Sequence, residues 1–315
     1  MTRIYPPSDH FQNGRFFNPG APEHGFKQLI KWVTNRKPGA WRKNIPSVPG
    51  PKPAARVQGS ELRATFIGHA TVLIQTEGLN LLTDPVFSER VSPLSFAGPR
   101  RHRAPGIRFE DLPPTDVLLI SHNHYDHLDL ATLRRLAKRD SPRFIVPTGL
   151  ARLLEKNGIS RAQELDWGES LPLERTTIHS VPAMHFSARG PFDRNRTLWC
   201  GYVLETANEI VYFAADTGFG DHFAQIRERF GPPRLALLPI GAYEPRWFME
   251  PIHMAPEQAV QAHKILSAQT SIAIHHGTFQ MADEGLDTPK KLLAACNPGD
   301  SFLTLDNGQS LMLAP

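Results

Sequence analysis

The stretch Ser121-His122-Asn123-His124-Tyr125-Asp126-His127-Leu128-Asp129 places three imidazoles and two carboxylates within nine residues. It directly follows Val117–Ile120, a short apolar run that is typical of a buried strand. It precedes Leu130–Arg139, in which apolar residues recur at helical spacing. The stretch is therefore predicted to be a turn from a strand to a helix, where side chains can point into a shared pocket.

The spacing within this turn indicates a metal site. His122 and His124 stand two apart, so both side chains point the same way in an extended turn. Asp126 and His127 follow where the helix is predicted to begin. Zinc takes nitrogen and oxygen ligands of this kind and, in catalytic sites, keeps a position for water. The turn is therefore expected to supply ligands to two adjacent cations.

Further ligands are expected where polar residues follow apolar strands, because a sheet presents its site at the ends of its strands. His185, Asp216 and the pair His275-His276 each follow such a strand. Strand alternation allows only one member of the pair to face the site. His179 lies within a predicted strand, and we expect it to be packed or exposed rather than a ligand.

Strands and helices recur twice along the chain, before and after the turn at Asp216, which suits two sheets sandwiched between helices. The long loop Asp84–Pro114 is expected to be a lid or a wall of the pocket. Residues Gly241–Met249 are expected to form a loop. Besides the helix after the metal turn, the pattern predicts helices at Phe26–Thr34, Thr148–Asn157, Ala224–Phe230, Pro256–Leu266 and Thr288–Ala295.

The motif at His122–His127, with later His, Asp and His at these intervals, resembles the metallo-β-lactamase superfamily. The resemblance implies an α/β fold, a four-layer αββα sandwich. Further blocks resemble the family of N-acyl-phosphatidylethanolamine-hydrolysing phospholipases D, and Tyr243–Met249 is the most specific of them. The blocks are Gly68–Leu73, Leu82–Pro85, Ile120–Asp129, Ala215–Gly218, Pro239–Met249 and Ile274–Phe279.

The resemblance implies two zinc ions, or other divalent transition metals, and assigns their ligands. The first zinc is bound by His122, His124 and His185, the second by Asp126, His127 and His275, and Asp216 bridges both. The family has an aromatic residue after the last ligand histidine, where this chain has His276. That departure makes His276 a group expected behind a ligand or beside the substrate.

The implied reaction is that of a phosphodiesterase of phospholipase D type. It would hydrolyse N-acyl-phosphatidylethanolamine-like lipids to phosphatidic acid and an N-acylethanolamine, by attack of a metal-bound hydroxide on phosphorus. Asp126 and Asp216 are assigned to catalysis as well as to metal binding. His253, which matches a family histidine, and His276 are expected to assist the leaving group with a proton.

Other side chains are expected near the substrate or behind the ligands. Arg246 and Tyr243 are assigned to substrate binding, since an arginine in a loop after a strand could pair with phosphate. An ion-paired Arg246 at the surface is an equally open interpretation. Asp84 and Asp129 are expected to orient ligand histidines.

Two further functions stay open. The same metals could hydrolyse a lactone or a small cyclic phosphodiester, because this scaffold serves many hydrolyses. A flavo-diiron protein is a weaker alternative, because it would have Glu in place of His124. The chain lacks both the aromatic and basic interleaving of a known nucleic-acid module and a basic body, which argues against a nucleic-acid partner.

Residues 1–60 are predicted to be a basic, aromatic-containing arm docked on the body, and residues 61–315 the hydrolase domain. The arm carries a net charge of +8, whereas the whole chain carries +4, so the body is acidic. The arm could contact an anionic membrane surface peripherally, or it could be a solvated segment around an acidic body. Trp32 and Trp41 could pack on the body, which we favour, or lie at a lipid interface.

Composition sets the remaining expectations. No run of 18 apolar residues is present, so no membrane-spanning helix is expected. The first twenty residues lack the apolar segment of a secretory signal. Cys200 and Cys296 are too few for a disulfide framework, which favours a reducing, cytoplasmic location. The oligomeric state is left open.

Overall fold

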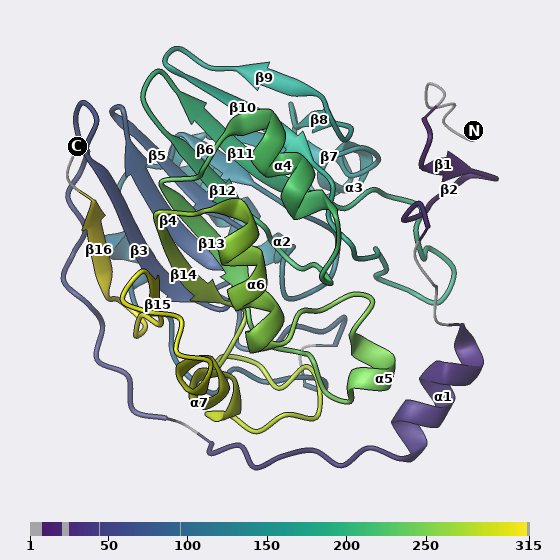
Figure 1. The fold of residues 1–315 in the computed structure, drawn as a ribbon. Coiled ribbons are helices and arrows are strands. Elements are labelled where there is room, and N and C mark those ends of the chain that lie inside the picture. Colours follow the sequence, from purple (N-terminus) through teal and green to yellow (C-terminus); the bar gives the residue numbers. More distant parts are fainter. Residues whose placement is uncertain (1–7, 21–24, 44, 95, 314–315) are drawn as a thin grey trace.

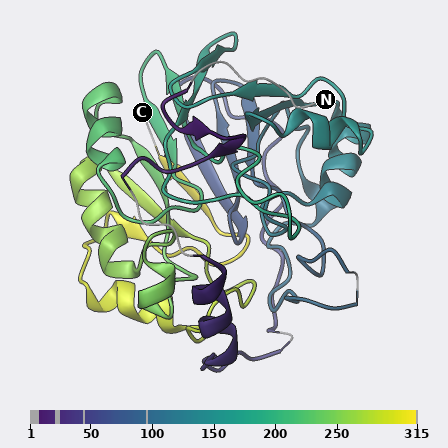
Figure 2. The same ribbon diagram turned by 90° about the vertical axis from the view of Figure 1, so that its right-hand side faces the viewer.

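The computed structural model describes residues 8–20, 25–43, 45–94 and 96–313, and Figure 1 shows their fold. Two seven-stranded sheets pack face to face, and helices cover the outer face of each. In the view of Figure 2, green helices lie to the left of the sheets and teal helices to the right. The four-layer αββα sandwich expected from the sequence is confirmed.

The first sheet carries the metal turn. Its strand order is β16-β3-β4-β5-β6-β7-β8, antiparallel from β16 to β5 and parallel from β5 to β8. Helices α2 (Leu130–Asp140) and α3 (Ala151–Glu155) pack on its outer face. The strands are β3 (Leu62–Gly68), β4 (Thr71–Thr76), β5 (Leu79–Thr83), β6 (Val117–Leu119), β7 (Arg143–Pro147), β8 (Gln163–Leu165) and β16 (Ser310–Leu313).

The second sheet is built in the same way, in the order β15-β14-β13-β12-β11-β10-β9. It is antiparallel from β9 to β12 and parallel from β12 to β15. Helices α4 (His222–Phe230), α6 (Pro256–Leu266) and α7 (Thr288–Ala295) cover it. The strands are β9 (Ser170–Pro172), β10 (Thr176–Val181), β11 (Gly201–Thr206), β12 (Ile210–Phe213), β13 (Leu235–Pro239), β14 (Thr270–Ile274) and β15 (Phe302–Leu303).

Strand alternation divides the apolar side chains between the core layers. In β13, Leu235 and Leu237 belong to the core between the sheets, whereas Ala236 and Leu238 face the helices. Because both faces of this strand are covered, all five of its residues are buried. Burial on both faces leaves the strand ends as the place where polar side chains can gather.

The structure corrects several element boundaries. Helix α3 is shorter than the predicted Thr148–Asn157, because Gly149 has a φ of +96° and cannot belong to a helix. The expected loop Gly241–Met249 contains a short helix, α5 (Arg246–Met249). The two strands at the end of the chain separate: β15 extends the second sheet, whereas β16 returns to β3 of the first.

The arm lies along the body and contacts it through aromatic rings. It contains the hairpin β1 (Phe11–Gln12) and β2 (Arg15–Phe16), then helix α1 (Phe26–Thr34), which matches its predicted range. Residues 1–7 and 21–24 of the predicted arm lie outside the described residues.

The arm tryptophans pack on the body. The Trp32 ring stacks on Phe248 at a centroid distance of 5.1 Å, and its indole donates to Asp283 Oδ2. The Trp41 indole donates to the carbonyl of Glu284. Figure 1 shows α1 beside α5. Among the described residues, no helix combines the length and apolar character needed to cross a bilayer.

His10 joins the arm to the body. Its Nε2 lies 2.7 Å from Asp166 Oδ1, its Nδ1 lies 2.7 Å from Asp9 Oδ1, and its ring stacks on Trp167 at 4.2 Å. Burial opposes protonation, but the hydrogen bonds to Asp166 and Asp9 outweigh it and raise the pKa of His10.

This raised pKa predicts a pH-dependent contribution to stability. The contribution is complete below the unfolded pKa of about 6.5 and is lost as the pH rises through the folded pKa. At pH 6, His10→Gln should therefore lower the melting temperature by about a few °C relative to wild type. At pH 9 the decrease should be smaller. Melting curves of both proteins at the two pH values test this, and an equal gap at both would contradict it.

Candidate metal centre

The metal turn is held at both of its ends by carboxylates. Where β6 ends, Ser121 donates its backbone N–H to Asp84 Oδ1 at 2.7 Å and its hydroxyl to Asp84 Oδ2 at 2.6 Å. At the other end, Asp129 is the N-cap of α2 and accepts from the N–H groups of Ala131 and Thr132. These bonds account for the sharp change from strand to helix over this stretch.

Asp129 also accepts the N–H groups of Phe87 and Ser88. It therefore fixes the backbone of the loop after β5, and the expectation that it orients a ligand histidine is wrong. An N-cap aspartate and a carboxylate behind a ligand look alike in sequence, because both stand beside the histidines. Asp84 does make the expected contact, since its Oδ2 lies 2.7 Å from His127 Nδ1.

Three histidines form the first group of ligand-type side chains. His124 Nδ1 lies 2.8 Å from His122 Nε2 and 3.1 Å from His185 Nε2. The outer nitrogens are occupied: His122 Nδ1 bonds the Ser121 hydroxyl, and His185 Nδ1 donates to the carbonyl of Ile252. Since the Ser121 hydroxyl donates its proton to Asp84, Nδ1 of His122 acts as a donor, as does Nδ1 of His185. The Nε2 lone pairs of His122 and His185 are therefore free, and both point towards His124 Nδ1.

Burial keeps these three rings neutral. It lowers the pKa of His122 and of His185 well below the usual range, and it lowers that of His124 to about 4. Neutral imidazoles whose lone pairs converge on one point fit a metal ion. His185 comes from the segment after β10, so the second sheet completes a group that the first sheet began.

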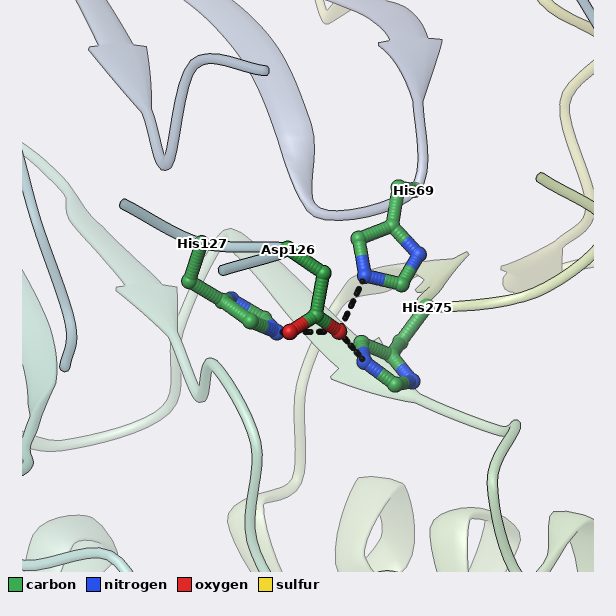
Figure 3. A group of neighbouring side chains, drawn as sticks. All are labelled: His69, Asp126, His127 and His275. Carbon is green, nitrogen blue, oxygen red and sulfur yellow. Dashed lines mark hydrogen bonds and ion pairs between the residues drawn. The ribbon is translucent and has the colours of Figure 1, made fainter. Parts of the chain in front are cut away.

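The second group surrounds Asp126 and Asp216. Asp216 Oδ2 lies 3.1 Å from His127 Nε2 and 3.1 Å from His275 Nε2. Asp126 Oδ2 lies 3.5 Å and 3.4 Å from the same two nitrogens. Asp216 Oδ2 is also 3.8 Å from His185 Nε2, so this carboxylate stands between the two groups. Figure 3 shows how the side chains of His127 and His275 converge on Asp126.

The donor set fits a cation on its own evidence. Within the described part of the chain, several buried atoms of this cluster lack a well-oriented hydrogen bond although carboxylates lie nearby, among them His127 Nε2, both ring nitrogens of His275, and Asp216 Oδ1. Buried polar atoms are normally satisfied. A divalent cation that prefers nitrogen and carboxylate oxygen would satisfy several of these atoms at once.

The two carboxylates dominate the electrostatics of this group. Burial opposes their ionisation, yet the positive charge of His127 lowers the pKa of Asp126 and of Asp216 well below the usual range. Burial likewise opposes protonation of His275, but the charge of Asp216 and the contact with Asp126 raise its pKa to about 9. The carboxylates thus draw protons onto the two histidines, and a cation could take the place of those protons.

His69 belongs to the second group although its sequence did not mark it as a ligand. It lies between β3 and β4, and its Nε2 is 3.0 Å from Asp126 Oδ2. Figure 3 marks this contact with a dashed line. The ring centroid of His69 is 4.1 Å from that of His275. The block Gly68–Leu73 includes this position. A single histidine in a tight turn, however, does not show in the sequence which distant carboxylate it contacts.

The pair His275-His276 separates as alternation predicts. His275 joins the second group, whereas His276 belongs to neither, and its ring stacks on Phe66 at a centroid distance of 5.6 Å. Burial lowers the pKa of His276 to about 3.

His253 lies at the edge of the cluster. Its Nδ1 is 4.0 Å from Asp216 Oδ2, and its ring contacts those of His185 and His275 at centroid distances of 5.0 and 5.5 Å. Burial lowers the pKa of His253 to about 4, so its ring is neutral at pH 7. It is close enough to touch a molecule that sits on the cluster.

Of the two residues assigned to the substrate, Arg246 begins α5 and Tyr243 lies just before that helix. Arg246 is paired with Glu257, and its Nε lies 3.7 Å from Glu244 Oε1, so the ion-paired interpretation describes it. Its guanidinium carbon is 5.1 Å from the centroid of the Tyr243 ring. Tyr243 is buried, and burial raises the pKa of its hydroxyl above the usual range.

Close backbone contact brings the loop after β13 to the loop after β14. A Cβ on Gly241 would lie 1.9 Å from the carbonyl oxygen of His275, which only glycine avoids. Glu284 Oε1 accepts the N–H of the next residue, Ala242. These contacts explain why a glycine stands two residues before Tyr243, where the most family-specific block begins.

Comparison with known proteins agrees with this geometry. The family described as "Beta-lactamase superfamily domain" matches residues 79–276. The chain is 42% identical over 268 residues to N-acyl-phosphatidylethanolamine-hydrolyzing phospholipase D 1 of Caenorhabditis elegans, covering 79% of this chain and 75% of that protein. It is 38% identical over 236 residues to the mitochondrial enzyme of the same name from Saccharomyces cerevisiae, covering 73% of this chain and 50% of that protein.

More distant similarities extend over most of the chain. A metal-dependent hydrolase of Methanopyrus kandleri is 27% identical over 252 residues, which are 79% of this chain and 99% of that protein. Among solved structures, an isothiocyanate hydrolase from Delia radicum gut bacteria superposes with a TM-score of 0.65 at 22% identity, covering 79% of this chain and 98% of that one. The latter likeness concerns the fold alone.

Three observations point to one family: the buried cluster of histidines and aspartates, the four-layer sandwich, and these relatives. The chain belongs to the metallo-β-lactamase superfamily and resembles the N-acyl-phosphatidylethanolamine-hydrolysing phospholipases D.

Proposed function

We propose that this chain is a zinc-dependent phosphodiesterase of phospholipase D type with a binuclear site. It would hydrolyse N-acyl-phosphatidylethanolamine-like lipids to phosphatidic acid and an N-acylethanolamine. The observation that carries the proposal is the position of Asp216, whose Oδ2 lies near ligand nitrogens of both groups. The names of the nematode and yeast relatives support the substrate, and the Methanopyrus relative supports metal-dependent hydrolysis.

We give the residues the roles that the resemblance implies. One cation would be held by the first group, the second by Asp126, His127 and His275, and Asp216 would contact both. Zinc suits these ligands, and other divalent transition metals take similar ones. When bound, two such cations supply a water-derived nucleophile at neutral pH and offset the charge of a phosphate.

The protein's own groups orient this site. Asp84 accepts from His127 Nδ1 and the carbonyl of Ile252 accepts from His185 Nδ1, so Nε2 of each ring is directed inward. His253 is neutral at pH 7 and can donate one N–H bond to an oxygen of the substrate. His276 lies outside the cluster, so no proton transfer is assigned to it.

Arg246 enters the proposal only with a rearrangement. Its carboxylate partners Glu257 and Glu244 already satisfy the guanidinium, so a phosphate would have to displace them. We therefore propose that the cations offset the phosphate charge, with Arg246 of α5 and Tyr243 as walls of the substrate site.

Asp216→Asn should lower the metal content below that of wild type and reduce turnover by at least about 100-fold, because it weakens the one ligand shared by both groups. The fold should be retained, as judged by circular dichroism. Metal content by mass spectrometry and hydrolysis rates test this. Asp306→Asn, at an exposed carboxylate paired with Lys290, serves as the control and should leave both readouts unchanged. Undiminished activity in Asp216→Asn would refute the ligand assignment.

The zinc-loaded protein should release phosphatidic acid from N-acyl-phosphatidylethanolamine, and a chelator should stop the release. Lipid products can be separated by mass spectrometry after incubation with mixed micelles. The same preparation should be offered lactones and small cyclic phosphodiesters. Turnover of those compounds alone would favour the alternative hydrolase and overturn the lipid substrate.

A lipid substrate requires contact with a membrane surface, and α1 is suited to it. Leu29, Ile30 and Val33 share one face of this helix and are 40%, 46% and 57% exposed. Trp247 of the neighbouring α5 is 43% exposed, and Lys31 lies over its ring at 4.8 Å. Since Trp32 and Trp41 pack on the body, these other side chains would enter the lipid. We infer a cytoplasmic protein that contacts anionic membranes peripherally through this face.

Replacing both Ile30 and Val33 by Gln should weaken binding to vesicles that contain an anionic phospholipid by about tenfold or more, because two apolar side chains lose their burial in lipid. Cosedimentation with vesicles measures this. Met312→Gln changes a similarly exposed apolar residue on β16 and should bind as wild type does. Equal binding by all three proteins would exclude α1 as the contact.

A further inference from the structure

The segment between His185 and β11 carries no strand, yet it reaches back to the metal turn of the other sheet. Arg189 makes the connection. Its Nη1 donates to the carbonyl oxygens of Asn123 and Leu128, both at 2.9 Å. These two residues flank the turn that contains His124, Asp126 and His127.

The same arginine is held against the turn by a ring. Its guanidinium carbon lies 3.8 Å from the centroid of the Tyr125 ring, and the Tyr125 hydroxyl donates to the carbonyl of Arg189 at 3.2 Å. The backbone N–H of Arg189 is bonded in turn by the carboxylate of Asp193, at 3.1 Å from each oxygen. Arg189 is thus held at three places: its backbone N–H, the face of its guanidinium group, and the Nη1 donor.

His185 and the residue next to it in the same segment also contact the arm and the metal turn. The ring of Phe186, next to the ligand-type His185, makes a T-shaped contact with the His124 ring at a centroid distance of 4.5 Å. Asn18 of the arm donates to the carbonyl of His185 at 2.8 Å. One segment therefore presents a ligand-type histidine and, four residues later, a clamp on the turn that holds the others.

We propose that Arg189 is a positioning residue that sets the metal affinity of the site by clamping both ends of the turn from Asn123 to Leu128. This inference rests on the proposed function, since it assumes that the cluster binds metal. Among the described residues, Arg189 makes no hydrogen bond or ion pair with a ligand-type side chain. It acts through the backbone, by fixing the distance between the carbonyls that bracket His124, Asp126 and His127.

Arginine suits this position for a physical reason. Its planar guanidinium can stack on an aromatic ring while its donors, fixed in the same plane, bond two carbonyls. Lysine carries the same charge but has neither the planar face nor the fixed donors. The substitution Arg189→Lys therefore removes the clamp without changing the charge beside the site.

Arg189→Lys should raise the zinc dissociation constant by about tenfold or more, the loss typical of removing a group that orients metal ligands. Competition with a chelator of known affinity measures that constant on the chain of residues 1–315, and melting curves of the metal-free protein measure stability separately. A purely structural role would lower the melting temperature while leaving zinc affinity unchanged. Unchanged affinity in Arg189→Lys would overturn the proposal.

Two further variants complete the experiment. Arg196→Lys makes the same substitution at an exposed arginine of the same segment and should bind zinc as wild type does. Tyr125→Leu keeps Arg189 but removes the ring beneath it, so it should lose affinity in the same direction by a smaller factor. If Arg189→Lys does not fold, Tyr125→Leu decides: wild-type affinity overturns the clamp. Wild-type protein that binds no zinc would instead refute the proposed function.

Discussion

The arrangement of the site depends on the burial of two carboxylates, those of Asp126 and Asp216. Asp126 and Asp216 lie where the two sheets meet, and no ionised carboxylate is stable there without compensating charge. His127 and His275 provide that charge when protonated, and cations would provide it when bound. Each sheet contributes to this balance: the first sheet brings Asp126 and His127, and the second brings Asp216 and His275. The site therefore ties the halves together as well as offering a place for chemistry.

Five of the twelve described non-glycine residues with a positive φ lie at the strand ends around this site. His69, Asp84, Ala215, Ala242 and His275 all have positive φ angles although none is glycine. Each such residue costs about 1–3 kcal/mol, so the surrounding packing must hold it in place. The left-handed turn at each strand end lets the chain leave the sheet abruptly, which directs the adjoining side chains inward. The buried strands behind the site supply the stability that offsets this cost.

Much of the fold and most of the cluster could be predicted because they depend on local pattern. Val117–Ile120, followed by the histidines and the helix at Leu130, needed only periodicity and spacing. Asp129 was misassigned because capping a helix and orienting a ligand require the same residue type near the turn. His69 and Arg189 were missed because their partners are distant in sequence, Asp126 for the first and the carbonyls of the turn for the second. Backbone acceptors in particular leave no signature in a sequence.

The sequence alone determined which residue types can donate to a metal and which strands they follow. Apolar strands ending in His or Asp predict a metal site at a sheet edge, whatever the topology. Only the tertiary structure decided which donors lie together, that His276 faces Phe66 while His275 joins the cluster, and that the arm packs Trp32 on the body but exposes Ile30. The physical reason is that spacing sets the direction of a side chain along its own strand. Contact between sheets depends instead on packing, which no single segment encodes.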